Sequence, residues 1–385
     1  MSNRSWDVVV GGGGLIGSAA AYHLARSGLR TLLIEQGCLA SGASGSNFGN
    51  VQVQDSEFGL SLELSLQGHE ACAGLEDELD TELDYQRTGS LLLIENEHQW
   101  AAMEERAAGL QAAGVPAQLL DQAELSRLEP SVSPASVIGA LYHASEGSLN
   151  PFKLVHAYVL RGRQHGLEVW THTEVTAVSV EGGRVAGVQT GGGPVAAGRV
   201  VLAAGAWAKR LAATAGVDLP LRWVHGEALI TEPLPPMVRC AISSAAFFEA
   251  TEESDQQVVG FCLRQRPEGN VMVGEAAILT EALGRRVTAT ALPAIAQEAR
   301  VRFPALLEAA VIRGWAIPVA FLPDNRPLLG AVDEVEGLVV GTGLKSTIVL
   351  TPLAGRLIAS LVLGKDIDPR LAEFSPSRAM AGAGQ

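Results

Sequence analysis

Residues 7–17 read Asp7-Val8-Val9-Val10-Gly11-Gly12-Gly13-Gly14-Leu15-Ile16-Gly17. We predict a short buried strand over residues 7–10, a tight turn over 11–17, a helix over 18–27 and a second strand over 31–34, which together form one βαβ unit. Gly12, Gly14 and Gly17 have the G-x-G-x-x-G spacing that lets a backbone turn sharply, approach a pyrophosphate and pack the helix against the strand. The amides and the dipole at the start of that helix favour the negative charge of such a ligand.

Glu35 ends the second predicted strand, where an acid can accept hydrogen bonds from a ribose diol. Its charge would repel a ribose phosphate, so the expected ligand is an unphosphorylated adenine dinucleotide. Glycine-rich turns are common, and the alternative is a merely flexible turn near the N-terminus. That alternative leaves Glu35 without a role, whereas strand, turn, helix, strand and acid together indicate a dinucleotide site.

The composition is that of a folded globular protein, with 385 residues of which 47% are hydrophobic and 18% charged. This length suits two domains or one large domain with an inserted lobe. No apolar run reaches the ~18 residues that span a bilayer, and Asp7 interrupts the apolar stretch near the N-terminus, so we expect a cytoplasmic protein without a transmembrane segment. A net charge of −14 without a basic cluster argues against nucleic acid as a partner.

The residues that could bind a metal are scattered along the chain. The four cysteines form no C-x-x-C pair, and the eight histidines include no H-E-x-x-H or similar helical pair. We therefore predict no metal site and no iron–sulfur cluster in this chain. The cysteines, which we expect to be reduced core thiols, are Cys38, Cys72, Cys240 and Cys262.

The rest of the chain alternates between two kinds of pattern. Residues 41–50 are rich in small residues, and we expect a loop that contacts the second half of the dinucleotide, with a solvated linker as the alternative. Residues 87–146 predict a separate lobe, and residues 151–203 return to the pattern of a nucleotide domain. Residues 220–315 predict an antiparallel sheet, and Thr351-Pro352 is expected to cap a last helix.

Several blocks of sequence, spread over almost the whole chain, resemble the flavin-dependent amine and amino-acid oxidoreductases, a family that includes D-amino-acid oxidase, glycine oxidase and sarcosine oxidase. Their order and spacing carry the resemblance more than any single block. Besides residues 8–17 and Glu35, the blocks are residues 41–49, Glu146-Gly147-Ser148-Leu149-Asn150-Pro151, Val200-Val201-Leu202-Ala203-Ala204-Gly205-Ala206-Trp207, residues 269–275, Pro323-Asp324-Asn325-Arg326-Pro327-Leu328-Leu329-Gly330 and residues 341–352.

The resemblance implies FAD as the cofactor and a fold that combines α/β with antiparallel β structure. We expect a discontinuous, Rossmann-like FAD-binding domain of residues 1–86, 147–219 and 324–385. An inserted substrate domain, built on an antiparallel sheet, is expected from residues 87–146 and 220–323. No cysteine falls where some relatives attach flavin covalently, so the FAD is expected to be non-covalent.

By resemblance, Val175 meets the adenine through its backbone, residues 204–206 line the dinucleotide, and Gly343-Leu344-Lys345 faces the flavin pyrimidine ring. Backbone amides beside a helix N-terminus, together with a lysine, would stabilise negative charge on a reduced flavin. The full set expected to bind FAD is Gly12, Gly14, Leu15, Ile16, Gly17, Glu35, Gln36, Gly42, Ala43, Ser44, Asn47, Phe48, Gly49, Asn50, Val51, Val175, Ala204, Gly205, Trp207, Gly343, Leu344, Lys345, Ser346 and Thr347.

Three segments resemble more closely the flavin (beta or B) subunits of bacterial heteromeric dehydrogenases that act on opines, hydroxyproline or proline. They are residues 49–54, residues 145–151, and Arg264-Gln265-Arg266 with Gly269-Asn270. The implied reaction is oxidation of a carbon–nitrogen bond in an amino acid or secondary amine. Hydride leaves the α-carbon for flavin N5, and the imine then hydrolyses. This chemistry depends on a neutral amine and a well-aimed C–H bond more than on a protein base.

The chain departs from the family where many members carry an arginine that binds the substrate carboxylate. The W-A-G-L-R-P-like segment is Trp315-Ala316-Ile317-Pro318-Val319-Ala320-Phe321 here, which places Val319 at about the position of the arginine. A carboxylate in a dry pocket needs a charged partner. We predict Lys345 as the replacement, Arg264 as the second candidate and His225 as the third. The alternatives are a solvated side chain for Lys345 and a surface strand residue for Arg264.

The route of the electrons is predicted from a second departure. Met272 falls where sarcosine oxidases carry the lysine that activates oxygen, which favours a dehydrogenase that passes electrons to an iron–sulfur or flavoprotein subunit. Thr342 replaces a frequent histidine of the last motif. The alternatives are a stand-alone oxidase that produces hydrogen peroxide and a non-catalytic FAD-binding assembly subunit. A nicotinamide-dependent dehydrogenase would share the first βαβ unit but not the flavin-type blocks after residue 200.

Overall fold

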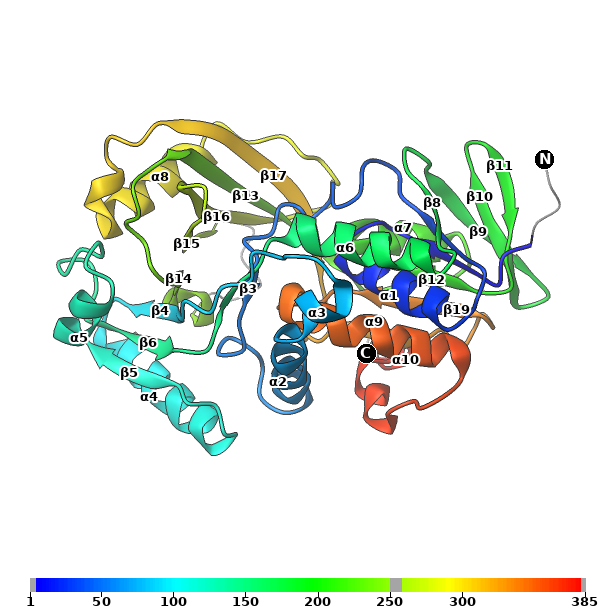
Figure 1. The fold of residues 1–385 in the computed structure, drawn as a ribbon, viewed down its shortest axis with the longest axis horizontal. Helices are drawn as coiled ribbons and strands as arrows, with labels where there is room; N and C mark the ends of the chain where they lie inside the picture. The colour runs from blue at the N-terminus through cyan, green and yellow to red at the C-terminus, as the bar shows by residue number, and fades with distance from the viewer. Residues whose placement is uncertain (1–4, 250–257, 382–385) are drawn as a thin grey trace.

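The computed structural model describes residues 5–249 and 258–381 and has two large sheets with helices packed around them (Figure 1). In the first sheet, neighbouring strands run parallel except for the first pair. Its six strands lie in the order β18 (Leu328–Ala331), β19 (Leu338–Thr342), β12 (Val200–Leu202), β1 (Val8–Gly11), β2 (Thr31–Ile34) and β8 (Glu168–Trp170). Strands from the first, middle and last parts of the chain therefore build one sheet.

The strands at the centre of this sheet are apolar throughout because both faces are covered. β1 and β2 are buried along their whole length, and the predicted strand over residues 31–34 is confirmed. The first helix, α1 (Leu15–Arg26), begins earlier than the predicted residue 18. The last glycine of the motif lies inside this helix, so the turn is shorter and the helix starts directly after Gly14.

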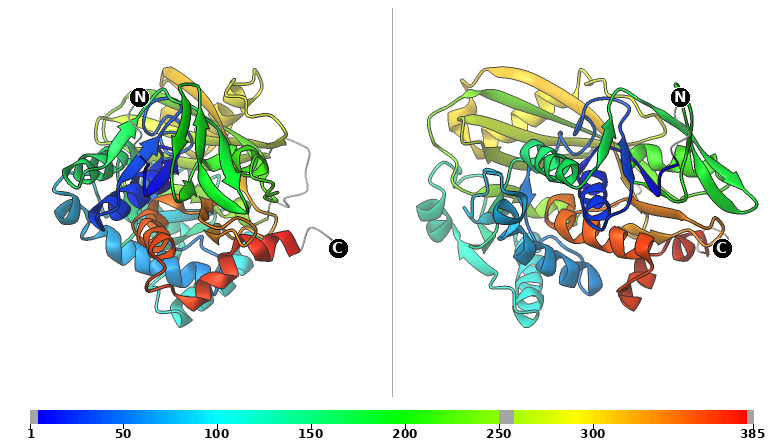
Figure 2. Two further views of the ribbon diagram at one scale, coloured as in Figure 1. Left: turned by 90° about the vertical axis from the view of Figure 1, so that its right-hand side faces the viewer. Right: turned by 45° about the vertical axis from the view of Figure 1, so that its right-hand side comes forward.

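Helix α9 (Thr347–Leu363) lies beside α1, and Figure 2 shows the two packed together in both views. A side chain at Gly355 would come within 2.6 Å of the Cβ of Ala19, so the close approach of the two helices requires a glycine. The prediction that Thr351-Pro352 starts this helix is wrong, because α9 begins at Thr347 and contains Pro352. The proline lies near the start of the helix, where its missing amide removes one backbone hydrogen bond.

The remaining helices of this part are α2 (Leu60–Cys72), α3 (Leu75–Leu79), α6 (Pro151–Gln164), α7 (Ala208–Ala213) and α10 (Pro376–Ala381). Asn150 caps α6 by accepting hydrogen bonds from the amides of Phe152 and Lys153, with Pro151 at the first helical position. A three-stranded antiparallel sheet of β9 (Val175–Glu181), β10 (Arg184–Thr190) and β11 (Gly193–Ala196) includes a hairpin at Gly182-Gly183, as the sequence predicts.

The second large sheet is mainly antiparallel and has eight strands. Their order is β17 (Val311–Phe321), β13 (Arg222–Pro233), β16 (Asn270–Thr280), β15 (Val258–Gln265), β14 (Ala241–Ser244), β4 (Ser90–Ile94), β6 (Gly139–His143) and β5 (Gln118–Asp121). The strands of residues 87–146 and those of residues 220–323 thus form one sheet, joined by the parallel pair of β14 and β4. Helices α4 (Glu97–Ala112), α5 (Gln122–Leu128) and α8 (Ala291–Arg302) pack around it.

Strands β3 (Asn50–Val51) and β7 (Gly147–Ser148) form a short antiparallel pair. In the sequence, each of them stands between a strand of the first large sheet and a strand of the second. The exact limits of the two domains stay a prediction. Within the part of the chain that the structure describes, no helix is both long and apolar enough to cross a membrane. Four 3₁₀ turns complete the described chain, η1 (Gly205–Trp207), η2 (Ala245–Phe248), η3 (Pro304–Leu306) and η4 (Pro369–Phe374).

Candidate active site

A cavity of about 1450 Å³ lies where the carboxyl ends of the parallel strands meet the long strands of the eight-stranded sheet. Gly12 and Thr342, at the ends of β1 and β19, lie on one wall, and residues of β13, β16 and β17 lie on the other. Ligands of open α/β sheets bind outside the carboxyl ends of the strands. The cavity is therefore at the place where the βαβ unit would hold its dinucleotide.

The three motif glycines are each required by a different close contact. Gly12 has φ +114°, and a Cβ there would lie 2.4 Å from the carbonyl oxygen of Ala203. A Cβ on Gly17 would lie 1.9 Å from the carbonyl oxygen of Gly12, and one on Gly14 would lie 2.6 Å from Oγ of Ser44. The first glycine thus shapes the turn, the last packs α1 against β1, and Gly14 keeps the cavity open beside Ser44.

Glu35 is held in place by the backbone on both sides of it. Its Oε2 accepts a hydrogen bond from the amide of Gly13 at 2.7 Å, and its Oε1 accepts one from the amide of Gly37 at 2.8 Å. Each oxygen keeps a further lone pair, and the side chain lines the cavity with Gln36. This arrangement fits the ribose diol of an adenine dinucleotide.

The small-residue segment 41–50 lies on the cavity wall rather than forming a solvated linker. Ser44 accepts a hydrogen bond from the amide of Leu15 at 2.9 Å, and Asn47 accepts one from the amide of Gly49 at 2.7 Å. Oδ1 of Asn50 is buried and has no hydrogen-bond partner among the described residues. The segment therefore presents polar groups to a ligand that would run from the glycine turn toward the second sheet.

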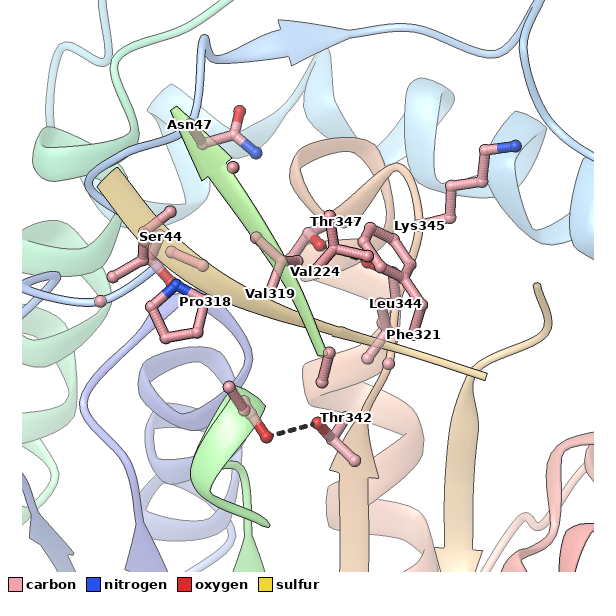
Figure 3. Close-up of a pocket in the computed structure, with 18 of the residues that line it drawn as sticks. Ser44, Asn47, Val224, Pro318, Val319, Phe321, Thr342, Leu344, Lys345 and Thr347 are labelled. Atoms are coloured by element: carbon pink, nitrogen blue, oxygen red, sulfur yellow. Dashed lines mark hydrogen bonds between the residues drawn. The ribbon is translucent and has the colours of Figure 1, made fainter. Parts of the chain in front are cut away.

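The opposite end of the cavity contains the turn between β19 and α9. Oγ1 of Thr342 donates a hydrogen bond to the carbonyl oxygen of Gly205 at 3.0 Å, which ties this turn to the 3₁₀ turn that follows β12 (Figure 3). Leu344, Thr347 and Val319 of β17 line this same cavity and are labelled in Figure 3. The first amides of α9 thus lie beside the chamber under the second sheet, where a flavin ring would be stabilised when reduced.

Most residues predicted to bind FAD line this one cavity, and three lie behind its wall. Gly17 is inside α1, where it packs against Gly12. Gly49 has φ +86°, and a Cβ there would lie 2.1 Å from the carbonyl oxygen of Leu149. Val51 is buried in the strand pair of β3 and β7. The predicted residues on the wall are Gly12, Gly14, Leu15, Ile16, Glu35, Gln36, Gly42, Ala43, Ser44, Asn47, Phe48, Asn50, Val175, Ala204, Gly205, Trp207, Gly343, Leu344, Lys345, Ser346 and Thr347.

Arg264, the second candidate for the substrate clamp, lies behind the 41–50 segment. Its Nη1 donates hydrogen bonds to the carbonyl oxygens of Phe48 at 2.5 Å and of Leu149 at 3.3 Å. Burial lowers the pKa of this guanidinium to about 10. It is a buried residue that holds the loop, rather than the exposed strand residue considered from the sequence.

His225 and Lys345 also differ from what the sequence suggests. His225 lies between Val224 and Gly226, which face the cavity, so its ring is on the other side of β13, with Nε2 3.1 Å from the carbonyl oxygen of Arg286. Lys345 lies on the wall, but its Nζ is 3.3 Å from Oε1 of Glu57 and its side chain is 37% exposed. Figure 3 shows this side chain extending away from Leu344 and Val319.

Two acidic residues on the wall, neither of them singled out from the sequence, have a pKa that burial raises. Glu275 is on β16, and burial raises its pKa. Asp55 follows β3, and burial also raises its pKa, against the opposing effect of Lys345 and Arg106. Oδ1 of Asp55 is buried without a hydrogen-bond partner among the described residues. The signal for Glu275 was an acid inside an apolar strand, and Asp55 had no signal of its own.

The other side chains at this end are mainly apolar. Phe48 and Trp315 face each other with ring centroids 6.4 Å apart, and Val319 of β17 takes the place expected for an arginine. Phe247 and Phe248 of η2 add two further rings to the wall. A dinucleotide cradle that opens into an apolar chamber under a β-sheet defines a dinucleotide-dependent oxidoreductase.

Comparison with known proteins identifies the family. Residues 7–361 match the family described as FAD dependent oxidoreductase (DAO), and the chain belongs to this family. It is 30% identical to glycine oxidase of Geobacillus kaustophilus over 398 residues that cover 100% of both chains. The crystal structure of that enzyme superposes with a TM-score of 0.88, at 26% identity, over 98% of this chain and 99% of the other.

Two other relatives are subunits by name. Hydrogen cyanide synthase subunit HcnC of Pseudomonas aeruginosa is 29% identical over 98% of both chains. Sarcosine oxidase subunit beta of Rhodobacter capsulatus is 25% identical over 98% of this chain and 90% of its own. These findings confirm the resemblance stated from the sequence, the mixed α/β and antiparallel fold, and FAD as the cofactor. The protein is an FAD-dependent oxidoreductase.

Proposed function

We propose that this protein oxidises the carbon–nitrogen bond of an amino acid or secondary amine, such as an opine, proline or hydroxyproline. The observation that carries the proposal is the apolar chamber under β13, β16 and β17, which adjoins the turn between β19 and α9 at one end of the dinucleotide cradle. Bound FAD supplies the acceptor for two electrons and one hydrogen. The cradle residues Gly12, Ser44 and Glu35 would hold the nucleotide half, and the 343–347 turn would hold the flavin ring.

The chain's own residues orient the substrate and exclude water. Phe48, Trp315 and Val319 surround the reacting carbon with apolar surface, which favours a neutral amine and keeps the imine from water until release. The substrate loses a hydride from the α-carbon and a proton from the nitrogen. Water then adds to the imine, and the C–N bond breaks to give a carbonyl compound and an amine or ammonia. This sequence of hydride loss, proton loss and hydrolysis requires no nucleophile from the protein.

A partner subunit is the proposed destination of the electrons, with both subunits in the cytoplasm. Met272 is buried in β16 and paired with Ile230 of β13, so the position discussed for oxygen activation holds an apolar core residue. The subunit names of the two relatives from Pseudomonas and Rhodobacter also support a multi-subunit assembly. A stand-alone oxidase is the second candidate, favoured by the full-length similarity to glycine oxidase.

The test is anaerobic reduction of the purified, FAD-loaded protein. Sarcosine, proline, hydroxyproline, glycine, D-amino acids and opines are added in turn, and we expect at least one of them to bleach the flavin absorbance. Slow recovery of the colour in air, with fast recovery by an artificial electron acceptor, is expected of a dehydrogenase. Fast recovery in air with peroxide would indicate the oxidase, and absence of bleaching across the set would favour the non-catalytic assembly subunit.

A further inference from the structure

Glu275 is an acid on the substrate side of the cavity, inside an apolar strand. Along β16, Glu275, Ala277, Ile278 and Leu279 line the cavity. Val271, Val273 and Ala276 are buried together in the core of the second sheet, and Glu275 has no partner in the register of β16 with β13 or β15, so the strand is irregular at this residue. The glutamate is therefore placed by the strand itself and not by a mobile loop.

Among the residues that the structure describes, none supplies a counter-charge to the carboxylate of Glu275. Among residues 5–249 and 258–381, its side chain has no described hydrogen bond or ion pair, and burial raises its pKa. Its charge also acts on the buried thiol of Cys262, another residue of the wall, whose pKa is raised first by burial and then by Glu275. The two side chains are therefore neighbours in the chamber.

Five arginine and lysine side chains of the described residues lie on the cavity wall, and four of them have a described partner other than Glu275: Arg210, Arg285, Arg326 and Lys345. The fifth, Arg222, begins β13, where it pairs with Phe321 of β17. Arg285 stacks on Trp207 at 5.1 Å and donates a hydrogen bond to the carbonyl oxygen of Ser41, which places it beside the cradle. Arg210 stacks on Trp223 at 5.4 Å. Lys345 pairs with Glu57 at 3.3 Å. Glu275 thus adds a negative group to a chamber whose described wall also includes the arginine at the start of β13.

Glu275 is half-buried, and a carboxylate that is partly removed from water without a partner costs free energy, which a ligand that brings a positive charge offsets. The nitrogen that is oxidised must be neutral, whereas an adjacent carboxylate would favour its protonated form. The partner of Glu275 is therefore a second cationic group of the substrate and not the reacting amine. The unpartnered Oδ1 of Asp55 gives this chamber a second acceptor on the wall that follows β3.

We propose that Glu275 binds a positively charged group of the substrate, so that the preferred substrates are amines or amino acids that carry a second ammonium or guanidinium group. This inference rests on the proposed amine oxidation but makes a separate claim about substrate charge. Val319, in place of the expected arginine, leaves the apolar wall of β17 opposite the carbon chain of such a substrate.

The first test compares pairs of compounds that differ only in the second cation. Lysine is paired with norleucine, in both enantiomers, and N-methyl-1,4-diaminobutane is paired with N-methylpentylamine. We expect the cationic member of a pair to reduce the flavin of the holoprotein about tenfold to a hundredfold more efficiently, the range of a charged hydrogen bond. Equal or better reduction by the neutral member overturns the inference while leaving the proposed oxidation intact.

The second test uses Glu275→Gln, which keeps the shape of the side chain, and measures binding by calorimetry with the oxidised holoprotein. We expect the dissociation constants of lysine and N-methyl-1,4-diaminobutane to rise about tenfold or more, with those of the neutral partners unchanged. Glu281→Gln, just beyond the same strand and exposed, is the matched control and should bind as the wild type does. Unchanged binding by Glu275→Gln, or no binding of the cationic compounds to the wild type, overturns the inference even if no amine bleaches the flavin.

Discussion

The two ends of the cavity are built in different ways. The nucleotide end is made by the backbone: the glycine turn, the amides of Gly13 and Gly37 on Glu35, and the start of α1. The chamber end is made by side chains of β13, β15, β16 and β17, which come from distant parts of the chain. A backbone site requires particular residues at fixed spacing, so it leaves a local motif. A side-chain site depends on which faces of separate strands meet, so it leaves only scattered signals.

The largest expected effect comes from breaking the backbone end. Gly12→Val should abolish FAD binding, because Gly12 has φ +114° and its Cβ would lie 2.4 Å from the carbonyl oxygen of Ala203. The ratio of flavin to protein absorbance measures this. Gly284→Val is the control, since in the described structure no atom lies within 4 Å of a Cβ built there and the position is exposed. A yellow Gly12→Val protein would contradict the role given to the glycine turn.

The difference between a site built by the backbone and one built by side chains also explains which parts of the structure the sequence predicts. The strand at residues 31–34, the glycine turn and Glu35 were predicted, because each is a local requirement of the βαβ unit. The start of α9 was not, because Thr351-Pro352 imitates a helix cap while the helix already begins at Thr347. The roles of Arg264 and His225 depend on which face of a strand meets the cavity. Alternation separates the two faces, but only the partner strands decide which one is inside.

The next largest effect is expected on the free energy of unfolding, and it comes from Glu146, a buried acid of the Glu146–Pro151 block. Oε1 of Glu146 accepts hydrogen bonds from the amides of Val53 at 2.6 Å and Gln54 at 2.8 Å, and Oε2 contacts Ser90 of β4. It thereby ties the segment after β3 to the second sheet. Burial raises the pKa of Glu146 to about 8, from an ordinary value of 4.5.

Between these two values the folded protein keeps a proton that the unfolded chain has lost. The free energy of unfolding should therefore fall as the pH rises, by about 1.4 kcal/mol per pH unit, from this group alone. Glu146→Gln is neutral at every pH and should flatten the dependence from about pH 5 to about pH 8. Urea unfolding at several pH values measures it, with the exposed Glu281→Gln as control. The same slope in Glu146→Gln and the wild type would rule out this assignment.

A smaller effect is expected for Arg264, which distinguishes a loop anchor from a substrate clamp. Arg264→Met leaves the carbonyl oxygens of Phe48 and Leu149 without this donor, so the free energy of unfolding should fall by about 1–3 kcal/mol and FAD should be lost faster. The ratio of KM values for an amine with and without a carboxylate should stay unchanged. Arg266→Met, which removes a surface pair with Glu268, is the control. A selective rise in KM for the carboxylate compound would return Arg264 to the substrate site.

The smallest expected effect concerns Lys345, which lies on the cavity wall in the turn between β19 and α9. Its Nζ pairs with Glu57 at 3.3 Å in an exposed position, and exposed charges contribute little to binding. Lys345→Met should therefore raise KM for a carboxylate-bearing amine only about two- to fivefold, with FAD content unchanged. Lys365→Met, beyond the end of α9, is the control. A hundredfold rise in KM would mean that Lys345 gives up its pair with Glu57 and binds the carboxylate of the substrate. The substrate end of the cavity would then be predictable from a local sequence motif, as the nucleotide end is.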